Sequence, residues 1–188
     1  MEVRMMLKHI PNILSTLRIG MVPLFAYVYF SDLPNAHYLA LGIFILAGIT
    51  DVLDGFLARH YNLITKIGTV LDPLADKLMQ LMAITCLAID EAIPVWLTLI
   101  VVFKELTMII TGIYMYFRKE STVMASNYFG KAATVLFSFA IFITILYPNS
   151  LASILLIGSA ILLKLTALIS YIRHYFIDVK PNLGKNKV

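Results

Sequence analysis

Four aspartates stand within a 26-residue stretch of this chain, as Asp51-x2-Asp54 and then Asp72-x3-Asp76. The residues around them are mostly apolar, and a carboxylate is costly in a bilayer, where it persists mainly to bind ions, move protons or contact a substrate. Carboxylates offer only oxygen ligands, which select hard cations such as Mg²⁺, with Mn²⁺ and Ca²⁺ as competitors. The stretch therefore predicts a site that binds divalent metal ions.

The spacing of the aspartates predicts how they come together. Residues three or four apart share one face of a helix, so Asp51 and Asp54 point one way, and Asp72 and Asp76 point one way. A short connection at 60–67 joins the two helix ends. We therefore expect the two pairs to face each other and to form a cage of carboxylate oxygens.

Such a cage needs compensating charge, because neighbouring carboxylates raise one another's pKa. The nearby sequence offers Arg59, Lys66 and Lys77, which are too few to neutralise it. Divalent cations would complete the compensation, and Asp51 and Asp72, from opposite helices, are placed to bridge two of them. Two such ions are a common device for clamping a diphosphate and stabilising charge at a phosphorus centre.

Two other interpretations of the aspartates stay open. They could form a buried ion-pair network with Lys77 and Arg59, or they could line a path for protons or other cations. The small residues Gly55 and Ala58 leave room for a flat or bulky group to approach the helix. They are equally typical of close packing between membrane helices.

The composition predicts an integral membrane protein. The 188 residues are 60% hydrophobic and 14% charged, against roughly 45–50% and about 25% in soluble domains. A span needs about 20 apolar residues, so the fold class we expect is an all-α bundle of six transmembrane helices in one domain, 1–188. The expected spans are 12–30, 38–58, 67–89, 92–117, 126–147 and 151–177. The net charge of +4 fits contact with lipid headgroups better than contact with nucleic acid.

The placement of Lys and Arg predicts the orientation. Basic residues fall in the N-terminal segment, after the second and fourth spans, and at the C-terminal end, whereas the connections near 31–37, 90–91 and 148–150 contain none. Cytoplasmic segments of membrane proteins carry this excess. We therefore expect a multi-pass cell-membrane protein with both termini and the aspartates on the cytoplasmic side, an interfacial segment at 1–11 and a basic tail at 179–188.

The aspartate stretch resembles a known family signature. Its full pattern is that of the CDP-alcohol phosphotransferase motif, D-x2-D-G-x2-A-R-x8-G-x3-D-x3-D, and the positions are Asp51, Asp54, Gly55, Ala58, Arg59, Gly68, Asp72 and Asp76. The family fold is a six-helix membrane bundle, often a homodimer. The resemblance implies that a CDP-linked lipid, usually CDP-diacylglycerol, donates its phosphatidyl group to an alcohol and that CMP leaves.

The resemblance also implies roles for individual residues. All four aspartates would bind metal, expected to be two Mg²⁺ ions with Mn²⁺ as a substitute, and Asp76 would in addition act as the general base on the acceptor hydroxyl. The donor CDP-lipid would be bound by residues of three segments: Asn12, Ser15, Gly55, Ala58, Arg59 and Thr65. The first two belong to the run 11–18, which is similar to the P-N-x-x-T-x-x-R opening of bacterial phosphatidylglycerophosphate synthases, with Ser15 in place of Thr. Asn12 could equally cap a helix.

The acceptor alcohol is less strongly indicated. An anionic acceptor such as glycerol 3-phosphate needs a basic pocket, and the candidate residues are Lys104, Arg118, Lys131 and Arg173. Lys104-Glu105 looks like the Arg-Glu pair of the glycerophosphate-using branch, and 130–134 looks like its G-K-x-K-T, with Ala133 in place of the second Lys. Lys104 could instead pair with Glu105, and Lys131 could simply reach the headgroups.

Three functional hypotheses follow. The first is a phosphatidyltransferase that uses CDP-diacylglycerol and glycerol 3-phosphate. The second keeps the chemistry with another acceptor: phosphatidylglycerol, as in a CMP-forming cardiolipin synthase, an inositol phosphate or serine. The third is a cation transporter, which the apolar outer halves of the spans disfavour. Lys164, deep in the last span, is given no role.

Overall fold

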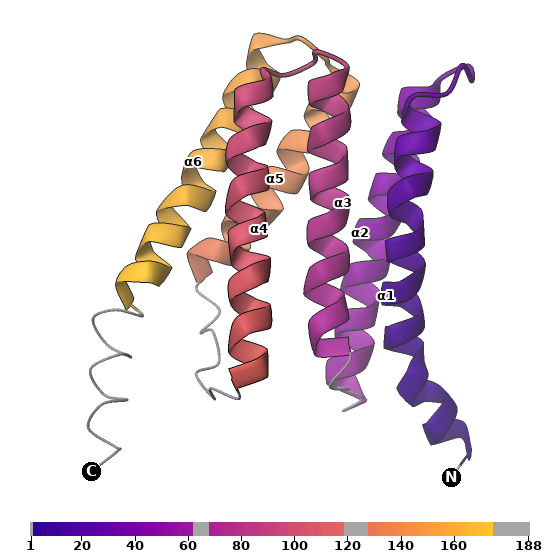
Figure 1. The fold of residues 1–188 in the computed structure, drawn as a ribbon. Coiled ribbons are helices and arrows are strands. Elements are labelled where there is room, and N and C mark those ends of the chain that lie inside the picture. Colours follow the sequence, from indigo (N-terminus) through magenta and orange to yellow (C-terminus); the bar gives the residue numbers. More distant parts are fainter. Residues whose placement is uncertain (1, 62–67, 119–127, 175–188) are drawn as a thin grey trace. The chain divides into compact units, whose positions relative to one another are not determined.

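The computed structural model describes residues 2–61, 68–118 and 128–174, and these residues form six α-helices (Figure 1). The all-α prediction is confirmed for this part of the chain. The helices are α1 (Glu2–Tyr29), α2 (Ala36–His60), α3 (Gly68–Ile89), α4 (Val95–Arg118), α5 (Tyr128–Leu146) and α6 (Leu151–His174). Each coincides with one expected span, although α1 begins ten residues before the apolar run at 12–30.

The helices divide into two compact units, with the boundary inside α4, between Thr98 and Leu99. In the first unit, α1 packs against both α2 and α3 (Figure 1). Phe25 of α1 is fully buried, and its ring lies 6.3 Å from that of Phe44 on α2. The small buried residues Ala47 of α2 and Ala75 of α3 leave space for neighbouring backbones to approach.

Polar contacts close one end of this first unit. The hydroxyl of Tyr29, the last residue of α1, donates a hydrogen bond of 3.0 Å to Oδ2 of Asp90, which follows α3. His37 at the start of α2 places Nε2 at 3.8 Å from the same oxygen. Asn35 has a φ of 63° in the turn before α2, a left-handed conformation that Asn tolerates better than most residues. This end lies opposite the C-terminal end of α2 and the N-terminal end of α3.

In the second unit, α5 packs against α6. Phe137 and Ala140 of α5 and Ile157 and Ala160 of α6 are completely buried. Alternation of bulky and small side chains allows the two helices to interlock. Asn149, between the helices, has a φ of 57°, so an asparagine again occupies the left-handed conformation.

The outer faces of the helices are strongly apolar. Within the described residues, the parts of α2 and α6 at Ala36–Phe56 and Leu151–Ile169 are long and apolar enough to cross a membrane. Large apolar side chains are exposed on every helix, for example Tyr27, Val52, Phe103, Val135 and Leu162. Exposed apolar faces of this extent are typical of contact with lipid or protein. The count of six spans, the orientation and the single domain remain predictions, and the basic tail at 179–188 lies outside the described residues.

Candidate active site

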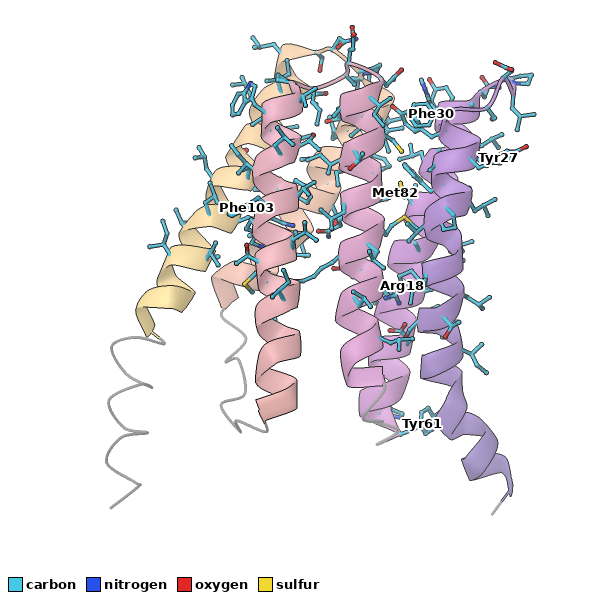
Figure 2. All side chains as sticks on the ribbon, in the orientation of Figure 1. Arg18, Tyr27, Phe30, Tyr61, Met82 and Phe103 are labelled. Atoms are coloured by element: carbon cyan, nitrogen blue, oxygen red, sulfur yellow. The ribbon has the colours of Figure 1, made fainter. Side chains whose placement is uncertain are left out.

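The first two aspartates of the signature share one partner, the guanidinium of Arg18. Asp51 and Asp54 lie one turn apart on α2, and Arg18 lies on α1. Nη1 of Arg18 donates to Oδ1 of Asp51 at 2.6 Å, and Nη2 donates to Oδ2 of Asp54 at 2.5 Å. In Figure 2, Arg18 lies where the ribbons of α1 and α2 come together. The spacing rule is therefore confirmed for this pair, because one planar group contacts both carboxylates.

Burial differs sharply within this group. The side chain of Arg18 is 1% exposed and that of Asp54 is 2% exposed, whereas that of Asp51 is 42% exposed. A buried charge is stable only when paired, and arginine presents several donors in a fixed fork suited to carboxylates. Arg18 therefore fixes Asp54 inside the helix packing and leaves the carboxylate of Asp51 open to a ligand.

The local sequence of α1 explains how Arg18 reaches this position. Ser15 and Arg18 are three residues apart, so they share a face of the helix. Both are buried, at 0% and 1% exposure, while their neighbours Ile13 and Leu17 are more than half exposed. The P-N-x-x-S-x-x-R run therefore presents its hydroxyl and its guanidinium on the buried face of α1.

The second pair of aspartates lies on α3. Asp76 is half-buried, two turns into the helix. Asp72 lies one turn earlier, but its side chain is outside the part that the structure describes. Among the described side chains, no three groups of the metal-binding kind stand together. The four-aspartate cage consequently stays a prediction that depends on the side chain of Asp72.

The donor set nevertheless fits a hard divalent cation. Asp51 directs one oxygen to Arg18, and its carboxylate remains partly accessible. Asp51 and Asp54 both present carboxylate oxygens on one face near the end of α2. Oxygen-only ligands with excess negative charge are the chemistry that Mg²⁺ and Mn²⁺ prefer.

The residues expected to bind the donor lie on α1 and α2 where the structure describes them. Ser15 is buried on α1, and Gly55, half-buried, follows Asp54 directly on α2. Asn12 belongs to α1, and Ala58 and Arg59 belong to α2, but their side chains lie outside the described residues, as does Thr65 altogether. Their roles stay predictions.

The residues expected to bind the acceptor belong to the second unit. Nζ of Lys104 on α4 donates to Oε1 of Glu105 at 2.8 Å, so the alternative pairing considered from the sequence does occur. Lys131 on α5 is exposed. Arg118 ends α4 and Arg173 lies near the end of α6, and both side chains are outside the described part.

Sequence reasoning missed two charged partners. It considered Arg59, Lys66 and Lys77 for the aspartates and overlooked Arg18, although an arginine inside an apolar segment calls for a partner. It also left Lys164 without a role. The structure pairs Nζ of Lys164 with Oε1 of Glu105 at 3.0 Å. The same rule calls for a partner of Lys164 but does not identify which residue it is.

The sequence was compared with known proteins. The profile of the CDP-alcohol phosphatidyltransferase family matches residues 8–169. The chain belongs to this family. The match includes Arg18 and every position of the aspartate signature, so the resemblance is confirmed, and the chain is a member of a family of phosphatidyl-transferring enzymes.

Relatives within the family carry two kinds of name. The human "Cardiolipin synthase (CMP-forming)" is 40% identical over 114 residues, 60% of this chain and 37% of the human protein. The CDP-diacylglycerol--glycerol-3-phosphate 3-phosphatidyltransferase of Bacillus subtilis is 31% identical over 138 residues, 67% of this chain and 70% of that protein. A probable phosphatidylglycerophosphate synthase of Mycobacterium tuberculosis is 30% identical over 182 residues, 94% of this chain and 86% of that protein. The chain thus spans little more than a third of the human relative.

Proposed function

We propose that this protein is a membrane phosphatidyltransferase that moves the phosphatidyl group of CDP-diacylglycerol to glycerol 3-phosphate and releases CMP. The observation that carries the proposal is the complete aspartate signature inside a family match of residues 8–169. The match to the mycobacterial phosphatidylglycerophosphate synthase, which extends over nearly the whole of both chains, supports glycerol 3-phosphate as the acceptor.

The reaction forms one P–O bond and breaks another. The hydroxyl oxygen of the acceptor attacks the phosphorus that carries diacylglycerol, and the bond from this phosphorus to the bridging oxygen of CMP breaks. The hydroxyl proton passes to a base, and CMP leaves with the bond electrons. Two bound Mg²⁺ ions would polarise the diphosphate and stabilise the charge on the departing CMP.

The chain's own residues would divide the work. Asp51, Asp54, Asp72 and Asp76 would hold the metal ions, and Arg18 would keep Asp51 and Asp54 oriented through its 2.6 Å and 2.5 Å contacts. Asp76 would accept the acceptor's proton, since a carboxylate close to the reacting hydroxyl can serve as general base.

Recognition of the donor nucleotide is assigned to the neighbouring positions. Gly55 and Ala58 would allow the cytidine to lie against α2, because neither side chain fills the space. Arg59 and Thr65 would bind the phosphates or the nucleotide, and Asn12 and Ser15 would contact its cytidine side. The acyl chains of the donor would enter sideways from the bilayer.

The acceptor phosphate would be bound by basic residues of the second unit, namely Lys104, Arg118, Lys131 and Arg173. We further propose six spans, cytoplasmic termini and a homodimer in the cell membrane. The exposed apolar faces support the membrane assignment, as do the segments of α2 and α6 that are long and apolar enough to cross a membrane. The cytoplasmic site follows from the distribution of Lys and Arg.

Phosphatidylglycerol is a second candidate acceptor, and both the names of relatives and two residues of this chain favour it. The relatives with the higher sequence identities are named cardiolipin synthases: the human protein is 40% identical and the Streptomyces coelicolor protein is 38% identical. The chain also has Lys104 and Ala133 where the glycerophosphate-using branch has Arg and Lys. Phosphatidylglycerol is therefore the alternative acceptor.

A panel of acceptors tests the choice. Purified protein is given CDP-diacylglycerol and Mg²⁺ with glycerol 3-phosphate, phosphatidylglycerol, an inositol phosphate or serine, and CMP and the lipid product are measured. We expect CMP only with glycerol 3-phosphate. If CMP is released only with phosphatidylglycerol, the assignment moves to cardiolipin synthesis. If none of the four acceptors leads to CMP release, the proposal is contradicted.

A further inference from the structure

The second unit contains a buried cluster of charged residues that do not belong to the aspartate signature. Oε1 of Glu105 on α4 accepts hydrogen bonds from Nζ of Lys104 at 2.8 Å and from Nζ of Lys164 on α6 at 3.0 Å. Nζ of Lys164 also lies 3.9 Å from the ring centroid of Phe137 on α5. Side chains from three helices therefore meet at one carboxylate.

The three charged side chains differ in access. Those of Glu105 and Lys164 are 4% and 5% exposed, whereas that of Lys104 is 15% exposed. The ammonium of Lys164 is fixed between a carboxylate and an aromatic ring, a favourable site for a cation. Lys104 is therefore the member that a ligand can reach, and Lys164 is the member that is held in place.

Two ammonium groups contact the same oxygen of Glu105. The contact of Lys164 with Glu105 already joins α6 to α4. Lys104 is the chain neighbour of Glu105 on the same helix, so its contact adds no link between helices. The ammonium of Lys104 can therefore turn from Glu105 to an anion without loosening the contact between α4 and α6.

Both lysines donate to the same oxygen of Glu105, so each hydrogen bond to that oxygen weakens the other. We propose that Lys164 is a positioning residue that occupies Glu105 and thereby keeps the ammonium of Lys104 available to the phosphate of the acceptor. This proposal rests on the proposed function, in which Lys104 contacts an anionic acceptor. The recognised chemistry is a phosphate oxyanion, carried by free glycerol 3-phosphate or by the headgroup of phosphatidylglycerol.

The test compares Lys164→Met with Lys164→Arg in purified protein. Lys164→Met removes the charge and leaves Lys104 as the only one of the two lysines on Oε1 of Glu105. We expect the KM for the acceptor to rise about tenfold, which corresponds to about 1.4 kcal/mol, because Glu105 then holds the ammonium of Lys104 more strongly. The KM for CDP-diacylglycerol should not change. Lys164→Arg should restore most of the acceptor KM.

The matched control is Thr166→Ala, two residues away on α6. Thr166 is exposed, and its hydroxyl contacts only the backbone oxygen of Leu163 among the bonds identified, at 2.9 Å. Thermal unfolding of each variant in detergent checks folding, and Lys164→Gln replaces Lys164→Met if the latter does not fold. Running glycerol 3-phosphate and phosphatidylglycerol in parallel identifies which phosphate the cluster serves.

Binding separates the two proposals. Glycerol 3-phosphate is titrated into the protein without donor, and Lys164→Met should weaken its Kd by the same factor. Wild-type protein that binds glycerol 3-phosphate but releases no CMP would contradict the proposed function, while the Kd of the variant still decides the role of Lys164. An unchanged acceptor KM and Kd, or equal increases in the KM for donor and acceptor, would overturn the positioning role.

Discussion

Arg18 organises two carboxylates that would otherwise repel each other within a buried helix packing. Its guanidinium lies 2.6 Å from Asp51 and 2.5 Å from Asp54. This arrangement holds the acidic side chains in place before any cation arrives. Preorganisation of this kind raises metal affinity, because the cation does not have to overcome the cost of gathering its ligands.

Replacing Arg18 should therefore destabilise the metal-free protein. Arg18→Met removes the guanidinium that contacts the buried carboxylate of Asp54, and breaking a buried pair costs about 3–5 kcal/mol. We expect a lower melting temperature in EDTA, and a larger rise on adding Mg²⁺ than the wild-type protein shows, since the cation supplies the missing charge. Thermal unfolding in detergent measures both. Equal melting temperatures for the variant and the wild type in EDTA would contradict the role of Arg18.

Asp76 carries the prediction for the chemical step. Asp76→Asn keeps the size of the side chain and removes the proton acceptor, so kcat should fall by about 100-fold or more. The variant should still fold and bind CDP-diacylglycerol. The matched control is Asp90→Asn, directly after the C-terminal end of α3, where the carboxylate accepts from Tyr29, and this change should leave kcat close to normal. Near-normal turnover by Asp76→Asn would refute its assignment as base.

The sequence specified the acidic residues of the site better than their partners. The spacing of Asp51 and Asp54 requires a shared helix face, and a shared face is what the structure has. Arg18 lies 33 residues before Asp51 in the chain, so its pairing depends on how α1 packs against α2. No local spacing rule contains that information. The contact between Lys164 and Glu105, which are 59 residues apart, could not be predicted for the same reason.

The helices themselves were largely predictable, because each corresponds to one apolar run. Asn35 and Asn149, in left-handed conformations, lie in the connections expected near 31–37 and 148–150. The start of α1 was less predictable, since the helix begins at Glu2 and the apolar pattern of residues 2–11 is interrupted by Glu2, Arg4, Lys8 and His9. Which faces of the helices meet depends on the packing of small residues, and a single sequence does not determine it.

The packing of α5 against α6 gives a prediction for these elements. Ala160 is completely buried, so Ala160→Leu should overpack the interface and lower the unfolding free energy by about 1–3 kcal/mol. Gly158 lies nearby on the same helix, and a Cβ built there meets nothing within 4 Å. Gly158→Ala is therefore the control and should retain or slightly increase stability. The idea fails if Ala160→Leu unfolds at the same temperature as the wild type.

At the scale of the whole molecule, the orientation in the membrane follows from charge placement. The chain has one cysteine, Cys86, which is buried, so a Cys86→Ala background is suited to labelling. In this background, Asp32→Cys should react with a membrane-impermeant maleimide in intact cells. Lys187→Cys should react only after the membrane is permeabilised, because the C-terminal end is expected in the cytoplasm. The opposite pattern would reverse the orientation.

The central claim for the whole molecule is that the aspartate signature performs metal-dependent phosphatidyl transfer. The most direct measurement is CMP release by the purified wild-type protein from CDP-diacylglycerol and glycerol 3-phosphate, first in EDTA and then with excess Mg²⁺. We predict no release in EDTA, full release after Mg²⁺ is added, and a dependence on the acceptor in the second condition. Release that continues at the same rate in EDTA would contradict the account.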